Sequence, residues 1–322
     1  MALDSPPLPT ELRKAACAIE TTTGTKATLT STDAITRLYD PTITYSTEKV
    51  DRPKNDISPQ GSLPGMRVAN CSWGNLLTSA STQPHWLRYL RMAGFADSGY
   101  TGAVAGVFKP TFPSVVTGTF ATYRPKRFLC ATGVVTNGVL TLTRGQAGRW
   151  QWTGLGAQEI PDSTSNVTGI TYEDIAPLYV GATLSLGTGA KLVVPTVTID
   201  LGNQLEARED IEAKDSTGSP TGIRSGKIMR VQPTIAMSPE ALGLDQRDWY
   251  AIRRNMTELA LSITLQAGTA TGSPKCVITA PKLRLDENTE EDDNGTLRDA
   301  LTFIPTGDES SAYLTFDFTP AA

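Results

Sequence analysis

Few residues of this sequence are of the types that carry out catalysis. His85 is the only histidine, so a Ser-His-Asp or Cys-His centre would have to use it. It directly precedes Trp86 at the start of a predicted helix, which favours a structural or capping role. The stretch GTGAK at residues 187–191 lacks the spacing and the following Ser or Thr of a phosphate-binding loop. We therefore expect no enzymatic activity and no cofactor.

Cysteines and an acidic run are the remaining candidates for metal ligands. The four cysteines are widely spaced and form no C-x-x-C pair, which favours small apolar core residues over a disulfide framework or a zinc site; they are Cys17, Cys71, Cys130 and Cys276. In the acidic run DENTEEDDNG at residues 286–295, the glycine comes too late for a calcium loop. The run is more typical of a solvated loop between two strands. A hydrolase with an unmarked pair of carboxylates stays open as an alternative.

Length and composition indicate a folded protein with two domains. The chain has 322 residues, of which 39% are apolar and 19% charged. Its net charge of −4 lacks the excess of positive charge that nucleic-acid binders normally carry. We find no hydrophobic run long enough for a signal peptide or a membrane span. These features predict a soluble protein made inside a cell, without membrane contact.

Short segments that alternate apolar and polar residues predict that the body of the protein is β. They are PTITYS (41–46), VLTLT (139–143), PTVTIDL (195–201), KLRLD (282–286) and YLTFDF (313–318). Turn signals separate such segments at Asn137-Gly138, Gly202-Asn203 and Asn294-Gly295. The sequence thus predicts a mainly β protein.

Two segments have helical spacing of apolar residues. PHWLRYLRMAGF (84–95) places Trp86, Leu90 and Ala93 on one face, and SPEALGLDQRDWYAIRRNMTEL (238–259) does so with Trp249, Ile252 and Met256. Because an apolar stripe normally packs on a sheet, we expect Trp86 and Trp249 to be core residues. The predicted fold class is therefore mainly β with flanking helices.

An internal repeat divides the chain in two. The tripeptide MRV recurs 163 residues apart (229 − 66), and Trp86 and Trp249 have the same separation (249 − 86). PTIT at 41–44 and PTVT at 195–198 are 154 residues apart. The difference of nine residues falls in the Gly- and Ser-rich segment 213–226, where a loop can absorb an insertion.

The repeat predicts two divergent copies of one unit. We expect residues 1–158 to form the first domain with an N-terminal arm, and residues 159–322 to form the second. Residues 38–158 and 193–322 should superpose, with Met66 over Met229.

Four stretches resemble the major tail tube proteins of long-tailed bacteriophages with flexible tails, in a type with a duplicated tube domain. They are LRKAACAIETTTGT (12–25), TDAI (32–35), PHWLRYLRMAGF (84–95) and TIDLGNQLEAREDI (198–211). The resemblance implies two tandem β-sandwich or half-barrel domains of the tail-tube type. It also implies self-assembly into stacked rings, a channel for genome ejection, and a place in the virion tail after assembly in the host bacterial cytoplasm. The tape-measure protein, other tail proteins and genomic DNA passing without specific binding are the implied partners.

The resemblance further implies six tube units around the axis, so a chain with two units predicts a trimeric ring with pseudo-sixfold symmetry. We expect subunit interfaces at charged residues of the paired stretches: Asp51, Arg52, Glu206, Arg208, Asp210, Asp215 and Arg224. The loop at 213–226 and its shorter counterpart at 54–65 are expected to contact neighbouring rings.

A host-facing adhesin or carbohydrate-binding β-sandwich protein of a virion is the main alternative. Trp150 and Trp152 in GRWQWTG suggest it, because exposed tryptophan rings stack on sugars. The competing interpretation is that both rings are buried.

Overall fold

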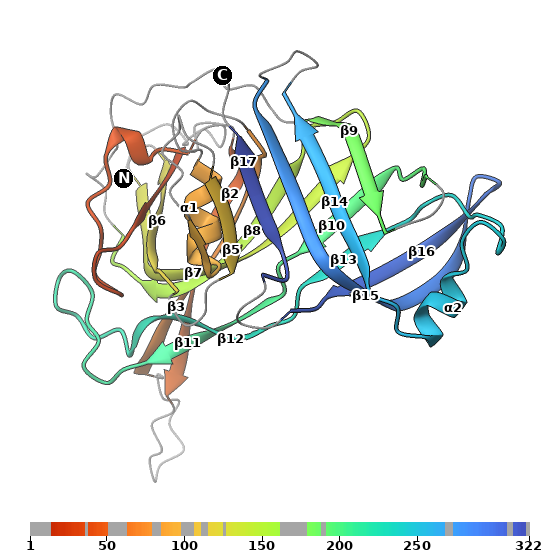
Figure 1. Ribbon diagram of the computed structural model, residues 1–322. Helices are drawn as coiled ribbons and strands as arrows, with labels where there is room; N and C mark the ends of the chain where they lie inside the picture. Colours follow the sequence, from red (N-terminus) through yellow and green to blue (C-terminus); the bar gives the residue numbers. More distant parts are fainter. Residues whose placement is uncertain are drawn as a thin grey trace, which may run out of the picture.

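A computed structural model describes residues 14–35, 38–50, 63–78, 85–97, 106–110, 115–124, 127–161, 179–187, 191–267, 273–307 and 312–319. The helical elements are η1 (Ser31–Asp33), α1 (His85–Met92) and α2 (Trp249–Arg254). The strands are β1 (Lys14–Ile19), β2 (Leu38–Val50), β3 (Leu63–Leu76), β4 (Phe95–Asp97), β5 (Gly106–Pro110), β6 (Gly118–Arg124), β7 (Arg127–Thr143), β8 (Arg149–Gln158), β9 (Tyr179–Leu186), β10 (Thr196–Asp200), β11 (Asn203–Glu209), β12 (Ile223–Val231), β13 (Thr234–Met237), β14 (Leu259–Gln266), β15 (Lys275–Asp293), β16 (Thr296–Pro305) and β17 (Thr315–Thr319). The prediction of a mainly β fold with flanking helices is confirmed (Figure 1).

The strands of the two halves pair in the same order. In the first half the antiparallel ladders run β1-β6-β7-β8-β3-β2, and in the second they run β9-β14-β15-β16-β13-β10. Each half also has one helix at the same place in the chain, α1 between β3 and β6 and α2 between β13 and β14. The domain boundary at residue 158 stays a prediction.

One sheet of fifteen strands, counted over the described residues, runs through both halves. β10 joins them by pairing with the end of β7, where Val197 lies opposite Leu142 and Ile199 opposite Leu140. β17, close to the end of the chain, pairs with both β15 and β5. Figure 1 shows β11 and β12 as a separate two-stranded hairpin that crosses below the main sheet.

A dense aromatic cluster fills the core of the first half. Trp150 and Trp152 of β8 are both 0% exposed and stack with ring centroids 4.6 Å apart. Trp73 of β3 stacks on Phe120 of β6 at 4.2 Å. Because neither ring of GRWQWTG reaches the surface, the suggestion that these tryptophans stack on sugars is wrong.

Tertiary packing corrects one predicted turn and one predicted loop. Asn137-Gly138 lies inside β7 and forms no turn, because the glycine leaves room for an aromatic ring: a Cβ at Gly138 would lie 2.4 Å from Trp152. The predicted turn at Asn294-Gly295 is present with positive φ at both residues. The acidic run before it is not a loop, since residues 286–293 belong to β15.

The second predicted helix is much shorter than expected. α2 begins after Asp248, whose carboxylate accepts a hydrogen bond from the amide of Ala251 at 2.8 Å. The preceding segment instead extends the edge of β16, with Glu240 bridged to Arg298. Met256 is 70% exposed, so it does not share the buried face of Trp249 as the spacing predicted.

Candidate assembly interfaces

The charged residues predicted for interfaces gather on the β11–β12 hairpin, except Asp51 and Arg52, which lie outside the described residues. Glu206 and Arg208 are on β11, Asp210 directly follows it, and Arg224 is on β12. Two surface ion pairs bridge its strands: Lys227 to Glu206 at 3.4 Å and Arg224 to Asp210 at 3.8 Å. Pairs of this kind add little stability.

The β11–β12 hairpin packs against β7 and β8 of the first half. The loop at 213–226 hydrogen-bonds to that half as well: the amide of Arg67 donates to the carbonyl of Thr221 at 3.0 Å, and the amide of Ser216 donates to Glu159 at 2.9 Å. The hairpin is therefore an intrachain contact between the halves. Contacts of this loop with neighbouring rings stay a prediction.

Within this loop, Asp215 forms a compact turn. Its carboxylate accepts hydrogen bonds from the amides of Thr217 and Ser219, both at 2.9 Å. Burial opposes ionisation, but the hydrogen bond from the Thr217 hydroxyl and those from the two amides outweigh it and lower the pKa of Asp215. The residue stabilises its own loop, whatever the loop contacts.

A buried polar junction joins the halves next to the β7–β10 ladder. The side-chain amide of Asn203 donates to the carbonyls of Ala93 at 2.9 Å and Thr136 at 3.0 Å. Asn137 accepts from the backbone amide of Asn203 at 2.9 Å and donates to Asp200 at 3.0 Å. The sequence analysis noted Asn137 and Asn203 only as turn residues, and their pairing across the halves was not predicted.

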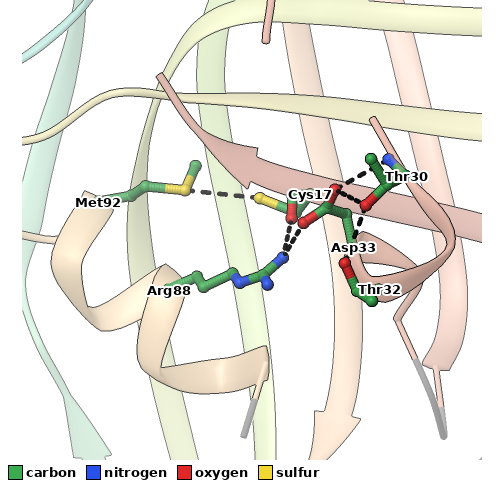
Figure 2. Close-up of polar contacts among 6 residues, drawn as sticks. All are labelled: Cys17, Thr30, Thr32, Asp33, Arg88 and Met92. Atoms are coloured by element: carbon green, nitrogen blue, oxygen red, sulfur yellow. Dashed lines mark hydrogen bonds and ion pairs between the residues drawn. The ribbon is translucent and has the colours of Figure 1, made fainter. Parts of the chain in front are cut away.

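The N-terminal segment is fastened to α1 by one arginine (Figure 2). The guanidinium of Arg88 donates to the Asp33 carboxylate and to the Cys17 carbonyl, both at 2.7 Å. Asp33 also accepts from the amide and the hydroxyl of Thr30. Burial opposes ionisation of Asp33, but the Thr30 hydrogen bonds and the Arg88 charge lower its pKa.

The second half has a comparable contact. Arg247, just before α2, donates to the carbonyl of Leu186 in β9 at 2.6 Å. Since β1 and β9 hold the same place in the pairing order, an arginine ties the helix region to the corresponding strand in both halves.

Two of the three buried carboxylates in the described part of the chain, Glu20 and Glu159, are occupied by protein donors, and the third is Asp299. Glu20 is 5% exposed and accepts from the amides of Gly24 and Gly133 and from the hydroxyls of Thr117 and Thr119, at 2.8–2.9 Å. Glu159 is 2% exposed and accepts from Ser216. Such fully bonded groups are typical of structural polar sites.

The described part of the chain shows neither an exposed cysteine nor a cluster of metal-binding side chains. All four cysteines are free and buried, and burial raises the pKa of each thiol. No group of three His, Cys, Asp or Glu side chains is arranged to hold a metal ion among the described residues. In the same residues, no helix is long and apolar enough to cross a membrane.

His85 predicts a pH dependence of stability. Burial, helped by the Arg88 charge, lowers the pKa of His85 from 6.5 to about 4. Because the folded state disfavours the protonated form, this contribution to stability is complete above pH 6.5 and is lost as the pH falls towards 4. We expect His85→Gln to make the melting temperature less sensitive to pH between 7 and 4. Equal slopes for the variant and the wild type would contradict this account.

Taken together, the molecule is a β-sheet protein whose polar groups hold strands and halves together. Its large apolar side chains exposed to solvent include Ile211, Leu244 and Met256. A family model described as phage tail tube protein matches residues 12–320, so the chain belongs to the phage tail tube protein family and is a component of a virion tail. No curated protein matches the chain.

Proposed function

We propose that this protein assembles into stacked rings of three chains with pseudo-sixfold symmetry, which form the tail tube of a flexible-tailed phage. The observation that supports this most is the shared pairing order of the two halves, β1-β6-β7-β8-β3-β2 and β9-β14-β15-β16-β13-β10. If each chain holds two tube units, three chains complete a ring of six units. Closed cyclic symmetry then needs one contact within the chain and one between chains.

The contact within the chain has the properties of a unit-to-unit interface. It combines the antiparallel β7–β10 ladder, the buried Asn203 junction and the packing of β11–β12 across β7 and β8. On this proposal, residues 1–158 and 159–322 are the two units, and the second unit of one chain meets the first unit of the next.

The lumen of such a tube would hold the tape-measure protein and then the genome. A net charge of −4 suits a channel wall that lets DNA pass without specific binding, because an acidic surface repels phosphate. The role is structural and not enzymatic, with assembly in the host cytoplasm alongside other tail proteins.

Electron microscopy and sedimentation of the purified chain test this function against the adhesin alternative. We expect long hollow tubes that sediment rapidly, and no binding on a glycan array. A chain that stays monomeric and binds glycans would overturn the proposal.

A contact between stacked rings is expected at the base of the 213–226 loop. Ile211 is 97% exposed there, an unusual position for a large apolar side chain. We expect Ile211→Asp to change the free energy of unfolding by less than about 0.5 kcal/mol, because the side chain makes no core contact. Tubes should nevertheless be replaced by single rings or short stacks.

The conservative variant Ile211→Val serves as the matched control and should assemble normally. Electron microscopy of both variants gives the length distribution of tubes. Tubes of wild-type length from Ile211→Asp would show that this position does not join rings.

A further inference from the structure

Several strands have an edge without a ladder partner within the described residues, among them β4, β9, β2 and the end of β15. β2 pairs with β3 alone, and β15 beyond Leu285 pairs with β16 alone. By contrast β10, which shares the PTIT-like sequence of β2, pairs with both β13 and β7. Thr42 and Thr44 of β2 are accordingly exposed, whereas Thr196 and Thr198 of β10 are half-buried. The free edges of β2 and β15 thus occupy the places that are joined by β10 and β7 inside the chain.

Carboxylates line the free segment of β15. They are Asp286, Glu287, Glu290, Glu291, Asp292 and Asp293. One ion pair is described for them, between Arg298 and Asp293 at 2.8 Å. Like charges along an unpaired strand oppose its pairing with a second copy of itself. A second chain that pairs with this edge therefore has to bring positive charge.

The β2 edge has such a charge. The guanidinium of Arg149, at the start of β8, lies 4.7 Å from the ring centroid of Tyr39 in β2. Arg149 is exposed and has no acidic partner among the described residues. A cation held over an aromatic ring keeps its position while it remains free to face a carboxylate.

Exposed apolar side chains lie on and around α2 and on β16. They are Leu244, Tyr250, Met256 and Leu297, each more than half exposed. The first half differs, since five of the eight residues of α1 are buried. α2 has one buried residue, Trp249. Figure 1 shows α2 beside the β15–β16 hairpin at the end of the molecule, away from β2. The α2 side of the hairpin is consequently a surface that a second chain can cover.

We propose that β2 of a second copy adds antiparallel to β15 beyond Leu285, with Arg149 of that copy as the counter-charge for the carboxylates. The pairing repeats between chains what β10 and β7 do within one. In the β7–β10 ladder, Thr196 lies opposite Thr143, next to the β7–β8 turn. The start of β2 therefore lies beside the β15–β16 turn, which brings Arg149 towards Glu291 and Asp292. This inference rests on the proposed ring and names its chain-to-chain contact.

Disulfide trapping tests the strand pairing directly. The natural cysteines are buried and do not compete. Thr44→Cys is combined in turn with Glu287→Cys, Thr289→Cys or Glu291→Cys, which alternate along one face of β15. We expect at least one pair to link most chains into covalent rings under mild oxidation of assembled tubes. Thr44→Cys with Ser31→Cys is the control, because Ser31 is exposed on η1, and it should leave the chains unlinked.

A charge exchange tests the role of Arg149. Arg149→Glu should reduce tube yield at least tenfold while the monomer melts as the wild type does, and Arg149→Lys should assemble. Adding Glu291→Arg to Arg149→Glu should restore most of the yield. Normal assembly by Arg149→Glu would overturn the role of this cation.

The outcomes separate this inference from the proposed function. Wild-type tubes with three chains per ring, but without any trapped pair, would refute the β2–β15 contact and leave the proposed function standing. Failure of the wild-type chain to form rings at all would count against the proposed function itself.

Discussion

Asn203→Asp is expected to unfold the protein or to lower its stability by about 3–5 kcal/mol, since a buried charge without a partner carries a cost of this size. The wild-type side chain donates to the carbonyls of Ala93 and Thr136 and is 7% exposed. A carboxylate of the same shape would face both oxygens without a proton to donate. Chemical denaturation of the purified subunit measures the difference.

Asn70→Asp is the matched control, because Asn70 is exposed on β3. We expect it to change stability by less than about 0.5 kcal/mol. If Asn203→Asp behaved like this control, the buried junction would not hold the two halves together.

Trp86→Ala and Trp249→Ala are each expected to cost about 3–5 kcal/mol, as for other large buried aromatics. Trp86 is 1% exposed and donates to the carbonyl of Thr78 at 3.1 Å. Trp249 is 3% exposed. The guanidinium of Arg247 lies over its ring, 4.5 Å from the centroid of the Trp249 ring. Both substitutions leave cavities under the helix of their half.

Thermal and urea unfolding of the two variants checks this expectation, with Trp86→Phe and Trp249→Phe as milder comparisons. A loss smaller than about 0.5 kcal/mol for either alanine variant would mean that the ring contributes no packing. Unequal losses would show how differently the two halves depend on their helices.

Local patterns predicted the elements whose neighbours agree with them. The period-two segments are strands, and the Asn294-Gly295 turn is present. The apolar stripe of Trp86, Leu90 and Ala93 is buried, with Ala93 directly after α1. In these places the local preference and the packing favour the same structure.

Local patterns failed where distant segments decide the structure. Asn137-Gly138 has the composition of a turn, but the Trp152 ring needs the space of that glycine inside β7. Residues 238–248 have helical spacing, yet the backbone of residues 239–241 pairs with β16 and residues 243–247 form a turn. The acidic run reads as a loop, although the long β15–β16 ladder makes it a strand.

The candidate interfaces were the hardest part to foresee. Charge and loop length indicated Glu206, Arg208, Asp210 and Arg224, and the structure places them on a hairpin against the chain's own first half. The buried junction at Asn203 and the free edges of β2 and β15 depend on which strands pair, and a single sequence holds no record of that pairing. The repeat gave one hint about these edges, because it makes β10 the counterpart of β2. In the structure β10 has a second neighbour, which β2 lacks among the described residues.

Image averaging of assembled tubes by electron cryomicroscopy tests the central claim most directly. The symmetry used in the reconstruction is determined from the images themselves. The number of chains per ring is therefore measured independently of the proposal. We predict three chains per ring, each contributing two similar units to a pseudo-sixfold wall. Six chains per ring would show that the second half is not a tube unit and would contradict the account.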